Sequence, residues 1–224
     1  MGDVCAYCGA ADPQTVDHVP PKLMLEEPYP NNIVTVPACL DCNKRFMKDD
    51  EYTRTVIALD FRAAGNSAAQ SRLPKVLRSL GYPKAKRFSD YLRRQLKPTD
   101  LVDATGNPLG IRAEVDISRI DATGKRFARG MYYYLAGTPI PREWEVHVLS
   151  KPGYNSVDFI VPNFNAIMDK CGDRAQGHIG SGFSFVAGRS VDGCVFGFLL
   201  YEYFWWIVAF LDKSAKIPGL VSQK

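Results

Sequence analysis

The sequence lacks the features that mark several special classes of protein. The first residues, MGDVCAYCGA, contain no basic region followed by an apolar stretch, so we expect no secretory signal and infer a cytoplasmic protein. No internal repeat or low-complexity tract is evident in residues 98–224. The composition, 46% hydrophobic and 23% charged, excludes a disordered chain and predicts a globular protein with a real core.

The sequence also has no apolar run long enough to span a membrane as a helix, although one segment comes close to that length. Residues 195–211, VFGFLLYEYFWWIVAFL, include Glu202 and fall short of the ~20 residues that a spanning helix requires. The segment is rich in aromatic and β-branched residues, and a turn at 188–193 separates it from the apolar stretch 183–187. We therefore predict a buried sheet and no membrane partner, and the membrane alternative is the less favoured.

Histidine is scarce, and the cysteines of the C-terminal half are isolated. His147 lies in an alternating stretch typical of a half-buried strand, which indicates a structural role. His178 lies in a glycine-rich stretch with no supporting motif. Cys171 and Cys194 show no ligand spacing and are predicted to be buried thiols. The third histidine, His18, stands in a different context.

Basic residues are almost absent from residues 1–43, which hold Lys22 against six acids. Residues 44–97 reverse the balance with fourteen Lys/Arg against five acids, and the rest of the chain is balanced. A charge run of this kind is usually a solvated helix face. Helical spacing and Gly/Pro punctuation predict three helices in this basic segment, at residues 50–64, 68–80 and 85–96.

Two C-x-x-C pairs stand near the N-terminus. Cys5 and Cys8 form the first pair and Cys39 and Cys42 the second, with thirty residues between them. In a reducing compartment such pairs are more plausible as metal ligands than as disulfides, and two of them supply four thiolates to one tetrahedral Zn²⁺. Because protein fills all four positions, this zinc is expected to be structural, and any catalysis requires other residues.

Polar residues that could act in catalysis or bind a metal ion lie between the two pairs and directly after the second pair. Asp17 and His18 are adjacent in TVDHVPPK, Asn32 lies in NNIVTVP, and Asn43 follows Cys42. On a strand neighbouring side chains face opposite ways, so Asp17 and His18 need different tasks. Plainer alternatives remain open, because an Asp-His pair can be a structural hydrogen bond and Asn32 can be a turn residue.

The combined run of C-x-x-C, D-H-V-x-P, N-I-V and C-x-x-C-N resembles the HNH endonuclease family over roughly the first fifth of the chain. The resemblance implies a ββα-metal module stapled by zinc. It implies that His18 is the general base and that Asp17 and Asn43 ligate a catalytic divalent ion. It further implies that Asn32 orients the histidine, and that the 3′ O–P bond is cut to leave a 5′-phosphate.

Asn43 departs from the pattern, because many members have histidine there. An oxygen ligand favours Mg²⁺ or Mn²⁺ for the catalytic ion. A histidine with an unperturbed pKa of ~6.5 suits proton abstraction from water. Beside this motif, the basic helices become a candidate phosphate track. The nearby bases Lys22, Lys44, Arg45 and Lys48 are candidate contacts to nucleic acid, although exposed lysines near zinc knuckles are common.

We predict an α+β fold in three segments: a zinc-stapled, treble-clef-like module at 1–50, basic helices at 51–97, and a larger α+β region with antiparallel sheet at 98–224. Within the last segment, Tyr132 to Tyr134 either stack bases or pack in the core, and packing is favoured. The elements predicted there are a strand at 109–117, a helix at 122–136, a strand at 144–149 and the apolar hairpin.

The expected activity is that of a metal-dependent endonuclease or nickase, with DNA the favoured substrate. The alternative is a catalytically silent zinc module that binds nucleic acid or a protein partner. A third hypothesis makes the C-terminal region a sensor that controls the nuclease. A double-strand break would need two protomers, so a homodimer is a reasonable expectation.

Overall fold

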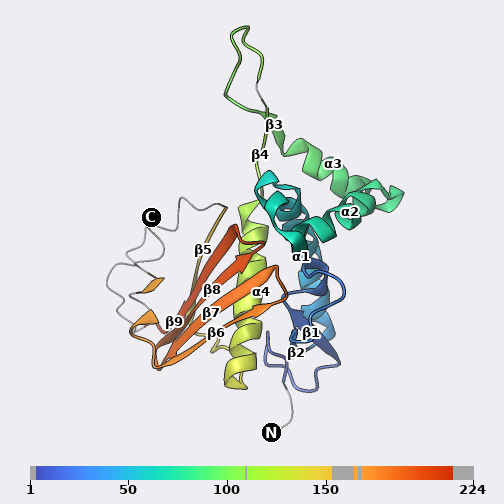
Figure 1. The fold of residues 1–224 in the computed structure, drawn as a ribbon. Coiled ribbons are helices and arrows are strands. Elements are labelled where there is room, and N and C mark those ends of the chain that lie inside the picture. Colours follow the sequence, from blue (N-terminus) through green and yellow to red (C-terminus); the bar gives the residue numbers. More distant parts are fainter. Residues whose placement is uncertain (1–3, 109, 153–163, 166–167, 214–224) are drawn as a thin grey trace.

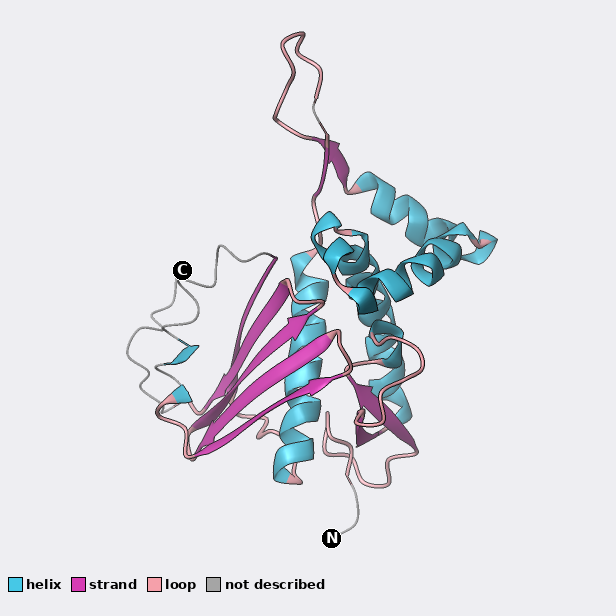
Figure 2. Ribbon diagram, in the orientation of Figure 1, coloured by secondary structure: helices cyan, strands magenta, loops and turns pink. Residues whose placement is uncertain are grey.

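The protein has an α+β fold in which a long helix lies between an N-terminal hairpin-and-helix module and a C-terminal sheet (Figures 1 and 2). The structure is a computed structural model that describes residues 4–108, 110–152, 164–165 and 168–213. All strand pairs in the described chain are antiparallel. The predicted fold class is therefore confirmed.

The N-terminal module consists of a hairpin and a helix. Strands β1 (Thr15–Val19) and β2 (Val34–Ala38) pair with each other, and a 3₁₀ turn, η1 (Lys22–Met24), lies in the connection between them. Helix α1 (Leu40–Leu59) follows β2 directly, and the Cys39 thiol caps its first turn by accepting a hydrogen bond from the Cys42 N–H. The hairpin and helix thus bring the two cysteine pairs to one end of the module.

The basic segment folds into two helices and a projecting hairpin. After the short turn η2 (Phe61–Gly65) comes α2 (Ser67–Gly81), capped by the Asn66 side chain. The turn η3 (Pro83–Ala85) leads to α3 (Lys86–Arg94), and β3 (Leu96–Pro98) pairs with β4 (Ile111–Ala113). Figure 1 shows this hairpin and its loop extending away from the rest of the molecule.

The C-terminal sheet has five strands in the order β5-β9-β8-β7-β6. Aromatic side chains on one face pack against α4 (Ile117–Ala136): the Phe127 ring contacts Phe183, Phe198 and Trp206 edge-on at 5.5 to 5.8 Å. The strands are β5 (Glu145–Pro152), β6 (Asp173–Ile179), β7 (Phe183–Ser190), β8 (Gly193–Leu200) and β9 (Phe204–Leu211).

Helix α4 approaches its neighbours closely on both sides, and two glycines permit this. A side chain at Gly124 would collide with the Trp206 ring of the sheet. A side chain at Gly130 would collide with Val19 of β1 and crowd the Tyr7 hydroxyl. The helix therefore packs directly against the N-terminal module and the sheet, and one continuous core includes residues of all three.

The boundaries of several elements differ from the sequence prediction. Helix α1 begins ten residues before the predicted position at Asp50, because its polar first turns are held by the cysteine cap rather than by an apolar stripe. Helix α4 likewise begins at Ile117 rather than at 122. The strand predicted at 109–117 is reduced to β4, and β6 has no counterpart among the predicted elements.

The long apolar run near the C-terminus forms two sheet strands, as predicted. Strands β8 and β9 are joined at Tyr201 and Glu202, which both have the positive φ of a tight hairpin turn. Glu202 is thus a turn residue, and its side chain accepts a hydrogen bond from Asn66. Among the described residues, no helix has the length and apolarity needed to span a bilayer.

Candidate functional site

The four N-terminal cysteines form a compact cluster. Their Sγ atoms all lie within 4.8 Å of one another. Gly9, with a positive φ of 69°, closes the first knuckle, and the Ala6 N–H donates to the Pro37 carbonyl of β2. The two knuckles are therefore held together by the backbone of the hairpin as well as by their own side chains.

The cluster fits a tetrahedral zinc ion. With Zn–S bonds of ~2.3 Å, tetrahedral geometry places sulfur atoms about 3.8 Å apart. The Sγ atoms of Cys8 and Cys39 are 3.7 Å apart. Against the effect of burial, backbone hydrogen bonds from Cys39, Tyr7 and Cys8 lower the pKa of the Cys5 thiol to about 7, whereas burial and the neighbouring thiols raise the pKa of Cys42. The structure thus contains a four-cysteine site that could bind zinc.

Asp17 and His18 are neighbours on β1 that are buried to different extents, and both lie at the wall of one groove. The half-buried His18 side chain lines a groove of about 460 Å³ between the hairpin and α1. Partial burial, together with the positive charges of Lys22 and Arg126, lowers the pKa of His18, while Asp17 opposes the shift. The imidazole is therefore neutral near pH 7, which is the form able to accept a proton.

Asp17 lies on the buried side of β1 and is held by four hydrogen bonds. The Arg126 guanidinium donates to both of its oxygens, Tyr7 donates its hydroxyl to Oδ2 at 2.5 Å, and the His18 N–H donates to Oδ1 at 2.8 Å. In this geometry neither oxygen is free to ligate a metal ion. Asp17 could do so only if Arg126 or Tyr7 withdrew.

Arg126 joins Asp17 to a second buried carboxylate, Asp50. Its Nη1 donates to Asp50 Oδ2 at 2.7 Å, while Asp50 Oδ1 is shielded from solvent and has no partner among the described residues. Burial raises the pKa of Asp50 to about 7, and the Asp17 charge adds to this rise against the attraction of Arg126. Two carboxylates thus share one guanidinium beneath the groove.

The two predicted asparagines occupy different places. Asn43 lies on the first turn of α1 and lines the groove together with His18, and its Nδ2 donates to Thr15 Oγ1 at 3.2 Å. Asn32 is exposed in the β1–β2 connection and donates to the His178 carbonyl of β6 at 2.6 Å. The structure therefore brings His18 and Asn43 together at the groove, whereas the Asn32 side chain is bonded to the sheet.

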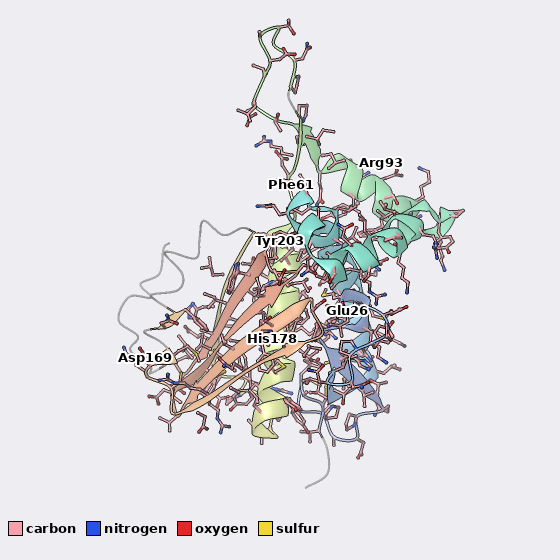
Figure 3. All side chains as sticks on the ribbon, in the orientation of Figure 1. Glu26, Phe61, Arg93, Asp169, His178 and Tyr203 are labelled. Carbon is pink, nitrogen blue, oxygen red and sulfur yellow. The ribbon has the colours of Figure 1, made fainter. Side chains whose placement is uncertain are left out.

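A second contact reinforces the junction that Asn32 makes. The Glu26 carboxylate accepts hydrogen bonds from the Ser181 N–H and hydroxyl, at 2.8 and 2.7 Å, in the turn between β6 and β7. Figure 3 shows Glu26 and His178 near this junction of module and sheet. The connection that follows His18 is thereby fixed to the C-terminal region.

Of the predicted basic contacts, Lys22 and Lys48 are exposed and line the groove. Lys44 is exposed on α1, and the Arg45 guanidinium lies over the Phe46 ring, with Nη2 3.9 Å from Cys42 Sγ. Farther along, α2 and α3 present exposed bases to solvent. These are Lys75, Arg78, Lys86, Arg87, Arg93 and Arg94.

Sequence analysis missed four charged residues that line the groove: Asp50, Glu51, Arg54 and Arg126. Two of them had a detectable signal, because Asp50 and Arg54 follow Asn43 by seven and eleven residues and so lie on the same face of α1. Arg126 had none, because it lies 109 residues after the carboxylate it binds.

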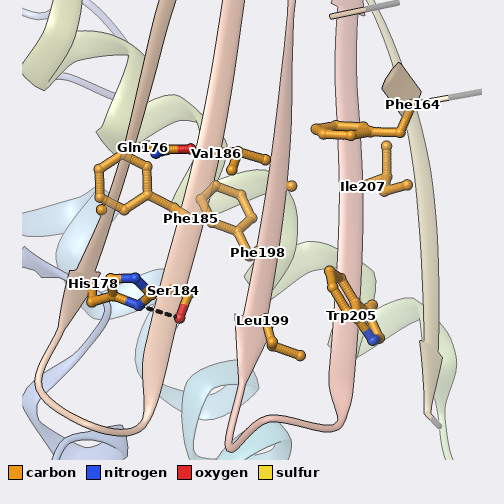
Figure 4. A pocket seen from close by; sticks show the side chains of 12 residues that line it. Phe164, Gln176, His178, Ser184, Phe185, Val186, Phe198, Leu199, Trp205 and Ile207 are labelled. Atoms are coloured by element: carbon orange, nitrogen blue, oxygen red, sulfur yellow. Dashed lines mark hydrogen bonds between the residues drawn. The ribbon is translucent and has the colours of Figure 1, made fainter. Parts of the chain in front are cut away.

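A separate hollow of about 370 Å³ lies on the sheet face opposite α4 (Figure 4). Apolar side chains such as Phe164, Trp205 and Ile207 form its walls, and His178 Nδ1 is 2.8 Å from Ser184 Oγ at its edge. It shares no lining residue with the His18 groove.

Comparison with known proteins gives no assignment. No family model, no curated protein and no solved structure matches this chain.

Proposed function

We propose that this protein is a metal-dependent endonuclease of the HNH type that hydrolyses nucleic-acid phosphodiester bonds, with DNA the favoured substrate. The observation that carries the proposal is the placement of a half-buried, neutral His18 at an open groove, on a hairpin that ends at four clustered cysteines able to bind zinc. The motif predicted the hairpin, the helix and this histidine as one unit.

In this proposal His18 accepts a proton from the attacking water. Its hairpin position is rigid, because β1 is paired along its length with β2 and its buried face is bonded to Arg126. Rigid placement matters, since a general base must lie within hydrogen-bond reach of the proton it takes. Asn32 would act indirectly, by holding the connection after His18 against the sheet.

A divalent ion at the groove would stabilise the negative charge that develops on the phosphate. Asn43 lines the groove and can offer its Oδ1, and Mg²⁺ commonly takes its other ligands from water and substrate phosphates. Asp17 does not fit as a ligand while Arg126 and Tyr7 hold it. The proposal therefore assigns Asn43 to the ion directly and Asp17 only after a rearrangement.

The distribution of charge supports a polyanionic substrate. Lys22 and Lys48 are exposed at the groove, whose acids Asp17 and Asp50 are paired with Arg126. Helices α2 and α3 add exposed bases, of which Arg78, Arg87 and Arg94 have no ion pair among the described residues. Lys/Arg contacts to phosphates supply affinity for nucleic acid that does not depend on sequence.

The experiment is cleavage of supercoiled plasmid with Mg²⁺ or Mn²⁺, comparing the unmodified protein, His18→Ala and His147→Ala. The last variant is a matched control, because His147 is an exposed histidine on β5. We expect nicking or linearisation that is lost with His18→Ala and with EDTA but kept by His147→Ala. Equal cleavage by both variants would contradict the proposal.

The alternative of a silent binding module has one observation in its favour, which is the engagement of Asp17 by Arg126. For a protein of that kind, neither the His18→Ala substitution nor the removal of Mg²⁺ would change the affinity for DNA. It would not cut DNA under any condition.

A further inference from the structure

Arg54 is a partly buried cation that makes no ion pair with the described residues. It lies on α1, on the same helix face as Asn43 and Asp50, and it lines the His18 groove. Its Nη2 donates to Thr55 Oγ1 at 3.3 Å and to Ser79 Oγ at 3.4 Å. Both distances exceed the usual 2.9–3.0 Å for such bonds. Its Nε is shielded from solvent and, among the described residues, has no partner.

The neighbouring arginines are neutralised, and this sets Arg54 apart. Arg72 pairs with Glu27 at 3.0 Å and also donates to the Lys22 carbonyl. Arg126 pairs with Asp17 and Asp50. Arg54 makes no ion pair within the described part of the chain, and burial lowers its pKa despite the opposing charge of Glu51.

Keeping such a cation half inside the protein disfavours folding, because a guanidinium loses hydration that two long bonds to hydroxyl groups do not replace. Hydroxyls also accept weakly compared with carboxylates or phosphates. The groove also holds the acids Asp17, Asp50 and Glu51, but Arg126 binds the first two, and no ion pair joins Glu51 to Arg54 among the described residues. The group that would complete the Arg54 fork is therefore an anion supplied from outside the protein.

We propose that Arg54 binds a backbone phosphate of the nucleic-acid strand that flanks the cut. The inference rests on the proposed function, since it requires a strand in the His18 groove. Eleven residues of helix separate Arg54 from Asn43, or about 16 Å along the axis. Arg54 therefore grips a phosphate away from the scissile one, through the fork that guanidinium presents to two phosphate oxygens. It is a binding residue and takes no part in the chemical step.

The test measures DNA binding by fluorescence anisotropy in a His18→Ala background, with duplexes of increasing length. The parent should gain affinity stepwise once the strand is long enough to reach Arg54. Arg54→Met should remove this step, lowering affinity for long duplexes roughly 10- to 100-fold. It should also reduce the slope of log affinity against log salt by about 1.

Two further variants control for charge and folding. Lys213→Met removes one exposed positive charge after β9 and should keep the step. Arg54→Lys keeps the charge but loses the forked guanidinium, so its gain in affinity with duplex length should be intermediate. If Arg54→Met fails to fold, the comparison of Arg54→Lys with the parent is the test. Because methionine retains the apolar stem, we expect the Tm of Arg54→Met to stay equal or to rise by about 2–4 °C.

Equal affinity of Arg54→Met and its parent at every length overturns the inference, whatever the Tm. A lower Tm beside it would make Arg54 a structural link to α2. The two proposals fail separately. A protein that never cuts but shows the Arg54-dependent step refutes the nuclease alone. A protein that cuts through His18 without the step refutes only the role of Arg54.

Discussion

Arg126 connects three parts of the chain through one guanidinium. It reaches from α4 to Asp17 on β1 and to Asp50 on α1, and its side chain is only 2% exposed. The role of Asp17 could not be predicted from the sequence for this reason, because its cation is supplied by a helix far along the chain. The motif identified the residue but not what binds it.

Replacing Arg126 with methionine should destabilise the fold strongly. The change leaves two buried carboxylates without a counter-charge, and removing one partner of a buried pair typically costs about 3–5 kcal/mol. Urea unfolding at pH 8, above the Asp50 pKa of about 7 in the unmodified protein, measures the loss. Arg119→Met is the matched control on the same helix: its pair with Asp49 is partly exposed, so we expect a loss of about 1 kcal/mol or less. Similar losses for both variants would refute a special role of Arg126.

At the scale of elements, the sequence predicted regular, apolar or well-punctuated segments accurately. Helix α2 begins and ends within one residue of its predicted bounds, and strands β7 to β9 form the predicted apolar hairpins. The start of α1 was wrong because its first turns are polar and depend on the Cys39 cap. Strand β6 was missed because it is an edge strand whose residues are mostly exposed and include Gly177.

The start of α1 should depend on zinc. Its cap residue, Cys39, belongs to the four-cysteine cluster, so the ion would join the first knuckle to this helix end. We expect about one zinc per chain in protein purified without chelator, and we expect Cys8→Ser to lose the zinc and several degrees of Tm. Cys171→Ser should retain the metal, because Cys171 lies outside the cluster. Metal analysis measures the zinc content of each variant, and thermal unfolding measures its Tm. A Cys8→Ser variant with full zinc content would contradict the assignment of Cys8 as a zinc ligand.

At the scale of the whole molecule, α4 binds the N-terminal module to the sheet. The division into segments 1–50, 51–97 and 98–224 remains a prediction about the sequence, and α1 runs across the first of these boundaries. Tyr7 of the module, Phe127 of α4 and Trp206 of the sheet belong to the same core. The residues of the candidate site could be predicted from a short stretch of sequence. The contacts that hold them in place could not, because they come from packing between distant parts of the chain.

A fragment of residues 1–97 should therefore fail to fold cooperatively, even with zinc. It would lack the Arg126 partner of Asp17 and the surface of α4 that covers Val19. We expect far-UV circular dichroism of the fragment to show a broad, non-cooperative transition, while the full chain unfolds in one step. Asp17→Asn in the fragment is an informative control, since it removes the uncompensated charge. A sharp transition for the unmodified fragment would refute the dependence on α4.

The close fit of α4 also has a consequence for how such a protein can change over generations. A gene segment that ended after α1 would carry the zinc ligands and His18 into a new chain but leave behind the cation of Asp17 and the Gly130 surface against β1. Recombination at that point would be inherited only if the recipient supplied an equivalent arginine and a small residue. We therefore expect this module to have diverged together with its own α4, and not as a freely exchanged cassette.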